Sequence, residues 1–372
     1  MKIPRTDYKI QSLRKEFLVF CLLCAWTMQM VSPQSSALDN IRRLICNGIP
    51  GLNERQIEIC TEVPQAINVL KDAQRVFESE CVWQFRKEKW SCTGVNMSIF
   101  SAPTLAETKE SAFVYALTSA LAVHQITTAC SNEDLGTACG CDASRNGQKT
   151  PQGWTWGSCS DNISYGLFFA QNFLDSRELI NQSTNVEHQN AMNQVHLHNN
   201  GAGRRVVADG MGRACRCHGF SGSCSVETCW NELPTIYEIG DKVKELYDEA
   251  IKVELYQPTS GPSFLRYMKD DEYIIPSTAD MVYLDESPRY CAASSNFTSQ
   301  RQCMPQAALN GSEFHDTDMK EHYPPCETFC CNGGYEAYHK QEVKSCDCTF
   351  VWCCEVVCQT CTTNVTEFRC TG

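Results

Sequence analysis

The chain has 372 residues, of which 26 are cysteine, and its formal net charge is −12. Hydrophobic residues make up 42% of it and charged residues 20%, which excludes a largely disordered chain and allows more than one domain with a packed core. The acidic balance disfavours nucleic acid as a partner and does not favour binding of a sulfated glycan.

The first residues have the pattern of a secretory signal peptide. A basic stretch precedes an apolar run over residues 17–28, which is too short to span a bilayer comfortably; a signal anchor is the alternative. We therefore expect residues 1–37 to be removed as a signal peptide and the mature chain to begin near Leu38.

Secretion would place the cysteines in an oxidising compartment. Removal of Cys21 and Cys24 leaves 26 − 2 = 24 cysteines, an even number that predicts disulfide bonds. Secretory passage also agrees with the sequons for N-glycosylation, which lie at Asn96, Asn162, Asn181, Asn296, Asn310 and Asn364.

Apolar periodicity predicts helices in the N-terminal two thirds of the chain. Stripes at helical spacing run over residues 63–77, with Pro64 in the first turn, and over residues 236–250. Residues 111–130 carry no formal charge, but their scattered polar side chains indicate a buried helix of a soluble domain rather than a membrane span. Residues 161–213 are also predicted to be mainly helical.

The composition changes over residues 257–288, where Pro, Gly and Ser interrupt the pattern and predict a linker. It would separate a helical N-terminal domain, residues 38–256, from a C-terminal domain, residues 289–372. The latter contains 12 cysteines between residues 291 and 370, which is typical of a disulfide scaffold.

Residues 345–361 of the C-terminal domain are predicted to form a β-hairpin. The adjacent Cys353 and Cys354 indicate a tight tip, and Val356 begins the return strand. Apolar side chains at this tip favour either binding to a partner or packing against the rest of the domain. Four residues recur at period two and would share one face: Cys346, Cys348, Phe350 and Trp352.

A second hairpin is predicted near the end of the N-terminal domain. Gly219 and Gly222 flank Ser221 and permit a tight loop, which would leave the serine hydroxyl projecting at the tip. Two nested disulfide rings could be closed here, Cys217 with Cys224 inside Cys215 with Cys229. In the entropic account of disulfides, closing the larger ring would restrict the unfolded chain by about 3 kcal/mol.

Residues alone leave the role of Ser221 open. It could be a solvated turn serine. It could also be the nucleophile of a secreted hydrolase, with His218 as the local base, but Ser223 stands where a nucleophile elbow has glycine and no strand-to-helix turn fits the ring. Zinc ligation by Cys215, Cys217 and His218 is disfavoured by the oxidising compartment.

The segment 215–224, Cys-Arg-Cys-His-Gly-Phe-Ser-Gly-Ser-Cys, followed by Cys229 and Trp230, closely resembles the signature of the Wnt family. The small departures are Arg216, Phe220 and Gly201. Further matches cover nearly the whole mature chain and lie at Glu80–Cys81, Trp90–Cys92, Cys139–Asp142, Gly153–Asn162, His198–Asn200, Tyr283–Cys291 and Phe350–Cys354.

The resemblance implies an α+β, two-domain Wnt fold, with a lipidated hairpin at residues 215–229 of the helical domain and a receptor-binding hairpin at residues 345–361. It implies that the acyltransferase Porcupine attaches palmitoleate to Ser221, with no other cofactor, metal or enzymatic activity. The carrier would be Wntless, and the destination would be the cysteine-rich domain of Frizzled. The residues implied in receptor binding are His218, Gly219, Phe220, Ser221 and Gly222 at one tip and Phe350, Val351, Trp352, Cys353, Cys354 and Val356 at the other.

The family pattern also implies the disulfide connectivity, which spacing alone leaves open. In the N-terminal domain the expected pairs are Cys46–Cys60, Cys81–Cys92, Cys130–Cys139, Cys141–Cys159, Cys215–Cys229 and Cys217–Cys224. In the C-terminal domain they are Cys291–Cys331, Cys303–Cys326, Cys330–Cys370, Cys346–Cys361, Cys348–Cys358 and the vicinal pair Cys353–Cys354.

The resemblance therefore predicts a developmental signalling ligand, secreted to the extracellular space and matrix. It would engage Frizzled with both tips while a low-density-lipoprotein-receptor-related co-receptor is held elsewhere, for which residues 257–288 are our candidate. A decoy that binds Frizzled without signalling is the alternative besides the hydrolase. Heparan sulfate is a frequent partner in the family, and here only the pairs Arg42–Arg43 and Arg204–Arg205 favour it.

Overall fold

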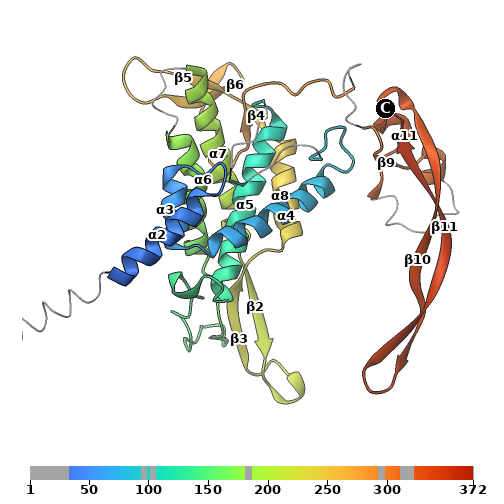
Figure 1. Cartoon of the computed structure of the whole chain (residues 1–372), viewed down its shortest axis with the longest axis horizontal. Coiled ribbons are helices and arrows are strands. Elements are labelled where there is room, and N and C mark those ends of the chain that lie inside the picture. The colour runs from blue at the N-terminus through green and yellow to red at the C-terminus, as the bar shows by residue number, and fades with distance from the viewer. Residues whose placement is uncertain are drawn as a thin grey trace, which may run out of the picture. The chain divides into compact units, whose positions relative to one another are not determined.

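Figure 1 shows the computed structural model of the chain. It describes residues 33–93, 99–100, 106–180, 187–291, 298–310 and 322–371. Contacts divide the chain into two compact units, Met1–Asn68 and Val69–Gly372, and each is described by itself. Most of the expected signal peptide, residues 1–32, lies outside the described residues.

The first unit contains α2 (Pro33–Asn47) and α3 (Glu54–Glu62), which the disulfide Cys46–Cys60 joins. The start of α3 is fixed by a capping box: the Asn53 side chain accepts from the Gln56 backbone N–H, and the Gln56 side chain accepts from the Asn53 backbone N–H. A third helix, α4 (Ala66–Gln84), begins in this unit and ends in the next.

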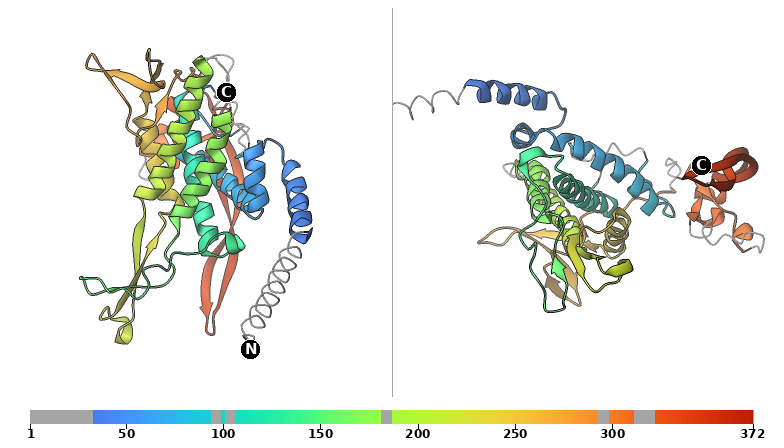
Figure 2. Two further views of the ribbon diagram at one scale, coloured as in Figure 1. Left: turned by 90° about the vertical axis from the view of Figure 1, so that its left-hand side faces the viewer. Right: turned by 90° about the horizontal axis from the view of Figure 1, so that it is seen from below.

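The helical part of the second unit is built around α5 (Lys109–Ser131), which contacts three other helices, α6 (Ile163–Ile180), α7 (Glu187–Asp209) and α8 (Ile236–Asp248) (Figure 2). Among the described residues α5 is the one helix long and apolar enough to cross a membrane, but 78% of its apolar window is buried inside the protein. A helix buried on all sides belongs to a core, as the sequence predicted.

The motif around His198 holds the helices together. A side chain at Gly203 of α7 would lie 1.9 Å from the carbonyl oxygen of Ala116, so glycine allows α7 to cross α5 closely. Arg204 donates two hydrogen bonds of 2.9 Å to the Asp175 carboxylate on α6. Asn199 is fully buried, and its side chain both donates to and accepts from the Val282 backbone, at 2.9 and 3.0 Å. These residues therefore have structural roles.

The segment predicted as a linker contains strands. Proline, glycine and serine gather in the loop before Phe264. The residues that follow form paired strands, and Leu265 packs with Val195, Val253 and Val282 in a small apolar cluster. Three strands lie within the segment: β6 (Phe264–Lys269), β7 (Glu272–Ile274) and β8 (Val282–Tyr283). Of the two strands just before it, β4 (Ile251–Lys252) pairs parallel with β8, and β5 (Glu254–Tyr256) pairs antiparallel with β6, which also pairs antiparallel with β7.

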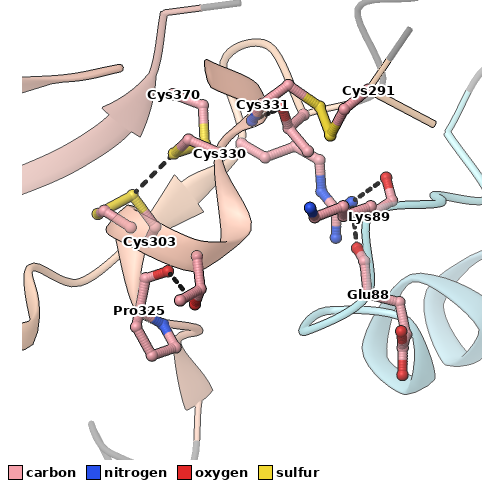
Figure 3. The surroundings of a disulfide bond; sticks show 12 residues. Glu88, Lys89, Cys291, Cys303, Pro325, Cys330, Cys331 and Cys370 are labelled. Atoms are coloured by element: carbon pink, nitrogen blue, oxygen red, sulfur yellow. Dashed lines mark hydrogen bonds between the residues drawn. A yellow bond between two sulfur atoms is a disulfide. The ribbon is translucent and has the colours of Figure 1, made fainter. Parts of the chain in front are cut away.

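The C-terminal region has a core made largely of sulfur. Phe329 packs among four buried cysteines of the disulfides Cys303–Cys326 and Cys330–Cys370, and Figure 3 shows these bridges beside Cys291–Cys331. Its elements are β9 (Gln302–Cys303), α9 (Gln306–Asn310), α11 (Cys326–Phe329), the 3-10 turn Cys331–Gly333, β10 (Tyr335–Val351) and β11 (Glu355–Cys370), and the strand order is β10-β11-β9.

Candidate functional site: two disulfide-bridged hairpin tips

The first hairpin consists of β2 (Gly212–Cys217) and β3 (Glu227–Glu232), which pair antiparallel, and it extends beyond the ends of the helices (Figure 1). A short strand, β1 (Thr155–Trp156), pairs parallel with β3 at its base. Cys215 and Cys229 lie opposite each other in the register and form one disulfide, and Cys217–Cys224 closes the tip inside it. The nested rings that the spacing suggested are formed.

The backbone of the tip loop turns sharply at Ser221. This residue has φ 56°, in the left-handed region, and Gly222 follows with φ 78°. Gly219 closes the loop by donating to the Ser223 carbonyl at 2.7 Å, and a side chain at Gly219 would lie 2.3 Å from that same oxygen. The loop therefore requires glycine at 219 and presents Ser221 outward, where it is exposed.

Ser221 has one large apolar neighbour, Phe220, and its other neighbours in the loop are small or polar. Phe220 is 95% exposed, so the tip offers a bare aromatic ring next to the serine. His218 is exposed, and among the described residues no hydrogen bond joins it to Ser221 or to a carboxylate. Cys215 and Cys217 both belong to disulfides, so neither offers a thiolate for zinc. Nucleophilic catalysis needs a base within reach of the hydroxyl, and among the described residues none is bonded to Ser221.

The second hairpin, β10–β11, is much longer than the predicted residues 345–361. Its stem is exposed on both faces, so it has no alternation of apolar and polar residues from which its length could be predicted. Near the tip, the disulfides Cys346–Cys361 and Cys348–Cys358 cross between the strands.

The prediction that Cys346, Cys348, Phe350 and Trp352 share one face of the hairpin is wrong, because the strand is irregular at Asp347. The register shifts between Cys346 and Thr349, and Asp347 takes a positive φ of 46°, as in a β-bulge. The bulge changes which side chains lie on each face before the tip. Large apolar side chains remain exposed at the tip, with Phe350 68%, Val351 45%, Trp352 90% and Val356 61% accessible.

The vicinal disulfide predicted at the tip is not formed, and Cys353 and Cys354 are free and exposed. Consecutive Cα atoms lie about 3.8 Å apart across a trans peptide, less than the ordinary separation of bridged cysteines. Both residues take positive φ values, 92° and 85°, in the turn that joins the strands. The structure forms the other eleven pairs that the resemblance implied, from Cys46–Cys60 to Cys348–Cys358.

The expected glycosylation sites differ in their surroundings. Asn364 is exposed on β11. Asn162 is half-buried: its oxygen accepts from the Tyr165 backbone N–H at 3.3 Å at the start of α6, and its amide donates to the Gly140 carbonyl at 3.0 Å. The side chain of Asn310 and the whole of three other sites, Asn96, Asn181 and Asn296, lie outside the described residues.

A buried charged group was missed by the sequence reasoning. Both ring nitrogens of His196 face carboxylates, Nε2 to Glu107 at 2.7 Å and Nδ1 to Glu178 at 2.9 Å, and the Tyr115 ring stacks on the imidazole at 4.0 Å. Burial lowers the pKa of His196, but the hydrogen bonds and charges of the two carboxylates outweigh it and raise this pKa to about 9. No local motif links these three residues, which come from separate segments.

Comparisons with known proteins agree with this arrangement. The profile of the wnt family matches residues 48–371. The chain is 34% identical over 348 residues to Protein Wnt-5a of Rattus norvegicus and to Protein Wnt-5a of Mus musculus, covering 93% of this chain and 88% of each relative. It is also similar to a solved structure of human WLS in complex with WNT8A, with a TM-score of 0.53 and 30% identity over 82% of this chain and 93% of that one.

Proposed function

This chain belongs to the Wnt family and is a Wnt signalling ligand, and from that premise we propose that it is secreted, carries palmitoleate on Ser221 and binds the cysteine-rich domain of Frizzled with both hairpin tips. The observation that carries the proposal is the position of Ser221. It is an exposed hydroxyl in the left-handed turn of a loop held by two disulfides, beside a fully accessible Phe220.

The acyl group would supply most of the affinity at this tip. At about 0.8 kcal/mol per buried methylene, a palmitoleoyl chain has a burial capacity on the order of 10 kcal/mol, against about 1.5–3 kcal/mol for an apolar side chain such as Phe220. A serine on a stiff loop holds such a chain clear of the protein and aimed at a partner. We propose Porcupine as the enzyme that attaches it.

An exposed acyl chain needs a carrier, because in water it partitions into membranes or aggregates. The similar solved structure is of a Wnt protein bound to WLS, which supports a Wntless carrier for this chain during export. The disulfides agree with export through the oxidising secretory route to the extracellular space and matrix.

The second tip would supply an aromatic contact. Trp352 at 90% accessible and Phe350 at 68% are too exposed to serve as core residues of the hairpin, so the alternative of packing within the domain is disfavoured. Exposed tryptophan is typical of residues that dominate protein interfaces. Binding through two tips of one ligand raises the affinity beyond that of either tip alone.

For the co-receptor we propose the outer face of the sheet β5–β6–β7. Met268 and Tyr273 lie opposite each other there and are 54% and 53% accessible. The Arg266 guanidinium lies between two tyrosine rings, with its Cζ 4.0 Å from the centre of the Tyr256 ring and 3.6 Å from that of Tyr273. These cation–π contacts hold the three side chains in place on this face. A low-density-lipoprotein-receptor-related protein would bind here while Frizzled holds the tips.

We do not extend the proposal to heparan sulfate or to catalysis. The arginines that favoured a sulfated glycan are already bonded to carboxylates, as Arg42–Asp39, Arg43–Glu54, Arg204–Asp175 and Arg205–Asp209. The exposed Ser221 has no base bonded to it among the described residues, so a hydrolase is disfavoured.

The test compares Ser221→Ala with Ser225→Ala, an exposed serine of the same loop. Cells expressing each variant are labelled with an alkyne fatty acid, and secretion, Frizzled binding and Wnt reporter activity are measured. We expect Ser221→Ala to lose the label, secretion and activity because only the acceptor oxygen is removed, and Ser225→Ala to keep them. Equal labelling of both variants would refute acylation at Ser221, and binding by the wild type without reporter activity would indicate a decoy.

A further inference from the structure

Arg301 belongs to the base of the second hairpin. Its carbonyl accepts from the Cys370 backbone N–H at 3.0 Å, and Gln300 donates to the Cys370 carbonyl at 3.0 Å. The next residue, Gln302, begins β9 and pairs with Arg369 of β11. The Arg301 backbone is therefore part of the sheet from which β10–β11 extends, and its position is fixed relative to the hairpin.

The Arg301 side chain leaves this sheet and enters the helical part of the chain. Its guanidinium donates to five backbone carbonyls in the segment that follows α4, and its Cζ lies 4.6 Å from the centre of the Phe329 ring. Figure 3 shows Glu88 and Lys89 of this segment close to the disulfides of the cysteine-rich region. The acceptors are Glu88 at 2.6 Å, Lys89 at 3.0 Å and Trp90 at 3.2 Å from Nη1, and Phe85 at 2.8 Å and Arg86 at 3.2 Å from Nη2.

The loop that receives the guanidinium is held in place by contacts of its own. All five acceptor carbonyls, from Phe85 to Trp90, follow the end of α4 at Gln84. Phe85 is fully buried, and the disulfide Cys81–Cys92 closes the loop. Burial lowers the pKa of Arg301 to about 10, which leaves it charged at neutral pH and favourable beside carbonyl dipoles.

Only arginine suits this position. Its planar fork carries several N–H donors and no acceptor, so one side chain can serve five oxygens, whereas a lysine ammonium has three donors at a single point. A second contact, Trp83 with His322 at 4.9 Å between ring centres, is a single edge-on ring contact. Arg301 thus attaches the base of the hairpin by five hydrogen bonds from one side chain.

We propose that Arg301 is a positioning residue for receptor binding: it fastens the base of the β10–β11 hairpin to the loop after α4 and so holds the second tip where it can bind the same Frizzled domain as the first. The inference rests on the two-tip binding proposed above. When the two tips are held at a fixed distance, binding of one tip gives the other a high effective concentration at the receptor. If the second hairpin can move relative to the first, part of this gain in affinity is lost although both tips are intact.

The first measurement is the distribution of distances between the hairpins. Non-natural amino acids for spin labels are placed in the full chain at two exposed residues, Val226 just before β3 and Val343 of β10. Pulsed electron resonance then compares the wild type with Arg301→Ala, Arg301→Lys and the control Arg289→Ala, an exposed arginine outside this contact. We expect a narrow distribution for the wild type and control, and broad ones for both Arg301 variants, because lysine keeps the charge but loses the fork. Unchanged distributions would overturn the proposal.

The second measurement is a double-mutant cycle on affinity for the Frizzled domain. Arg301→Ala is expected to weaken binding about tenfold in the wild type and less than about twofold when Trp352→Ala has already removed the second contact. An equal loss in both backgrounds would overturn a positioning role. If Trp352→Ala alone changes nothing, two-tip binding fails, while the distances still decide whether Arg301 fixes the hairpin. Arg301→Lys replaces Arg301→Ala in this cycle if the alanine variant is not secreted.

Discussion

The buried His196 predicts a loss of stability at mildly alkaline pH. Its two ring nitrogens can donate to Glu107 and Glu178 together only when the imidazole is protonated. Raising the pH removes that proton and leaves two buried carboxylates without a cation between them. The perturbation is therefore a pH change from 6.5 to 9.5, with Glu107→Gln as the matching substitution.

The magnitude follows from the pKa of His196, which is raised from 6.5 to about 9. At roughly 1.36 kcal/mol per pH unit, the charged form contributes about 3 kcal/mol to the free energy of unfolding. Because the folded pKa lies above the unfolded one, this contribution is fully present below pH 6.5 and is lost as the pH rises through about 9. Burial lowers the pKa of His124 and His198, so their effects fall below pH 6.5 and outside this window.

The assay is thermal unfolding of the secreted protein between pH 6.5 and 9.5, with the exposed His339→Gln as a control. We expect the wild type and the control to lose about 3 kcal/mol over this range. Glu107→Gln should lose clearly less, because one of the two charges that raise the pKa of His196 is absent. If Glu107→Gln and the wild type show the same dependence on pH, the assigned role of His196 is wrong.

Three further substitutions test the fold and the second tip. Trp352→Ala should weaken Frizzled binding by about 2 kcal/mol or more, whereas Val343→Ala on the exposed stem should not; surface plasmon resonance measures both, and equal affinities would make Trp352 dispensable. Asn162→Ala should cost about 1 kcal/mol in thermal unfolding because it removes the cap of α6, and an unchanged melting temperature would argue against that cap. Asn199→Ala should cost roughly 2–5 kcal/mol, since it leaves the buried N–H and C=O of Val282 without partners; a loss below about 1 kcal/mol would contradict this role.

The helices could be predicted because their burial follows the sequence pattern. Residues 236–250 show the apolar stripe of α8, in which Ile239 and Val243 are buried, and residues 111–130 become the enclosed α5. The first tip was predictable as well, because Cys217 and Cys224 flank Ser221 closely enough to close a ring. In these cases residues near each other in the sequence determine the structure.

The remaining features depend on contacts between distant segments. The length of β10–β11 was missed because its stem is solvated on both faces. The strands in residues 257–288 were missed because proline, glycine and serine interrupt the apolar pattern there. Glu107 meets His196, and Arg301 meets the loop after α4, only once the chain has folded. Nothing in the local sequence marks either pair.

The most direct measurement for the whole account is mass spectrometry of the peptide that spans Cys217–Cys224, taken from active protein secreted by cells. We expect this peptide to carry one palmitoleoyl ester, located on Ser221 by fragmentation. Active protein in which Ser221 is unmodified would contradict acylation as the basis of its activity.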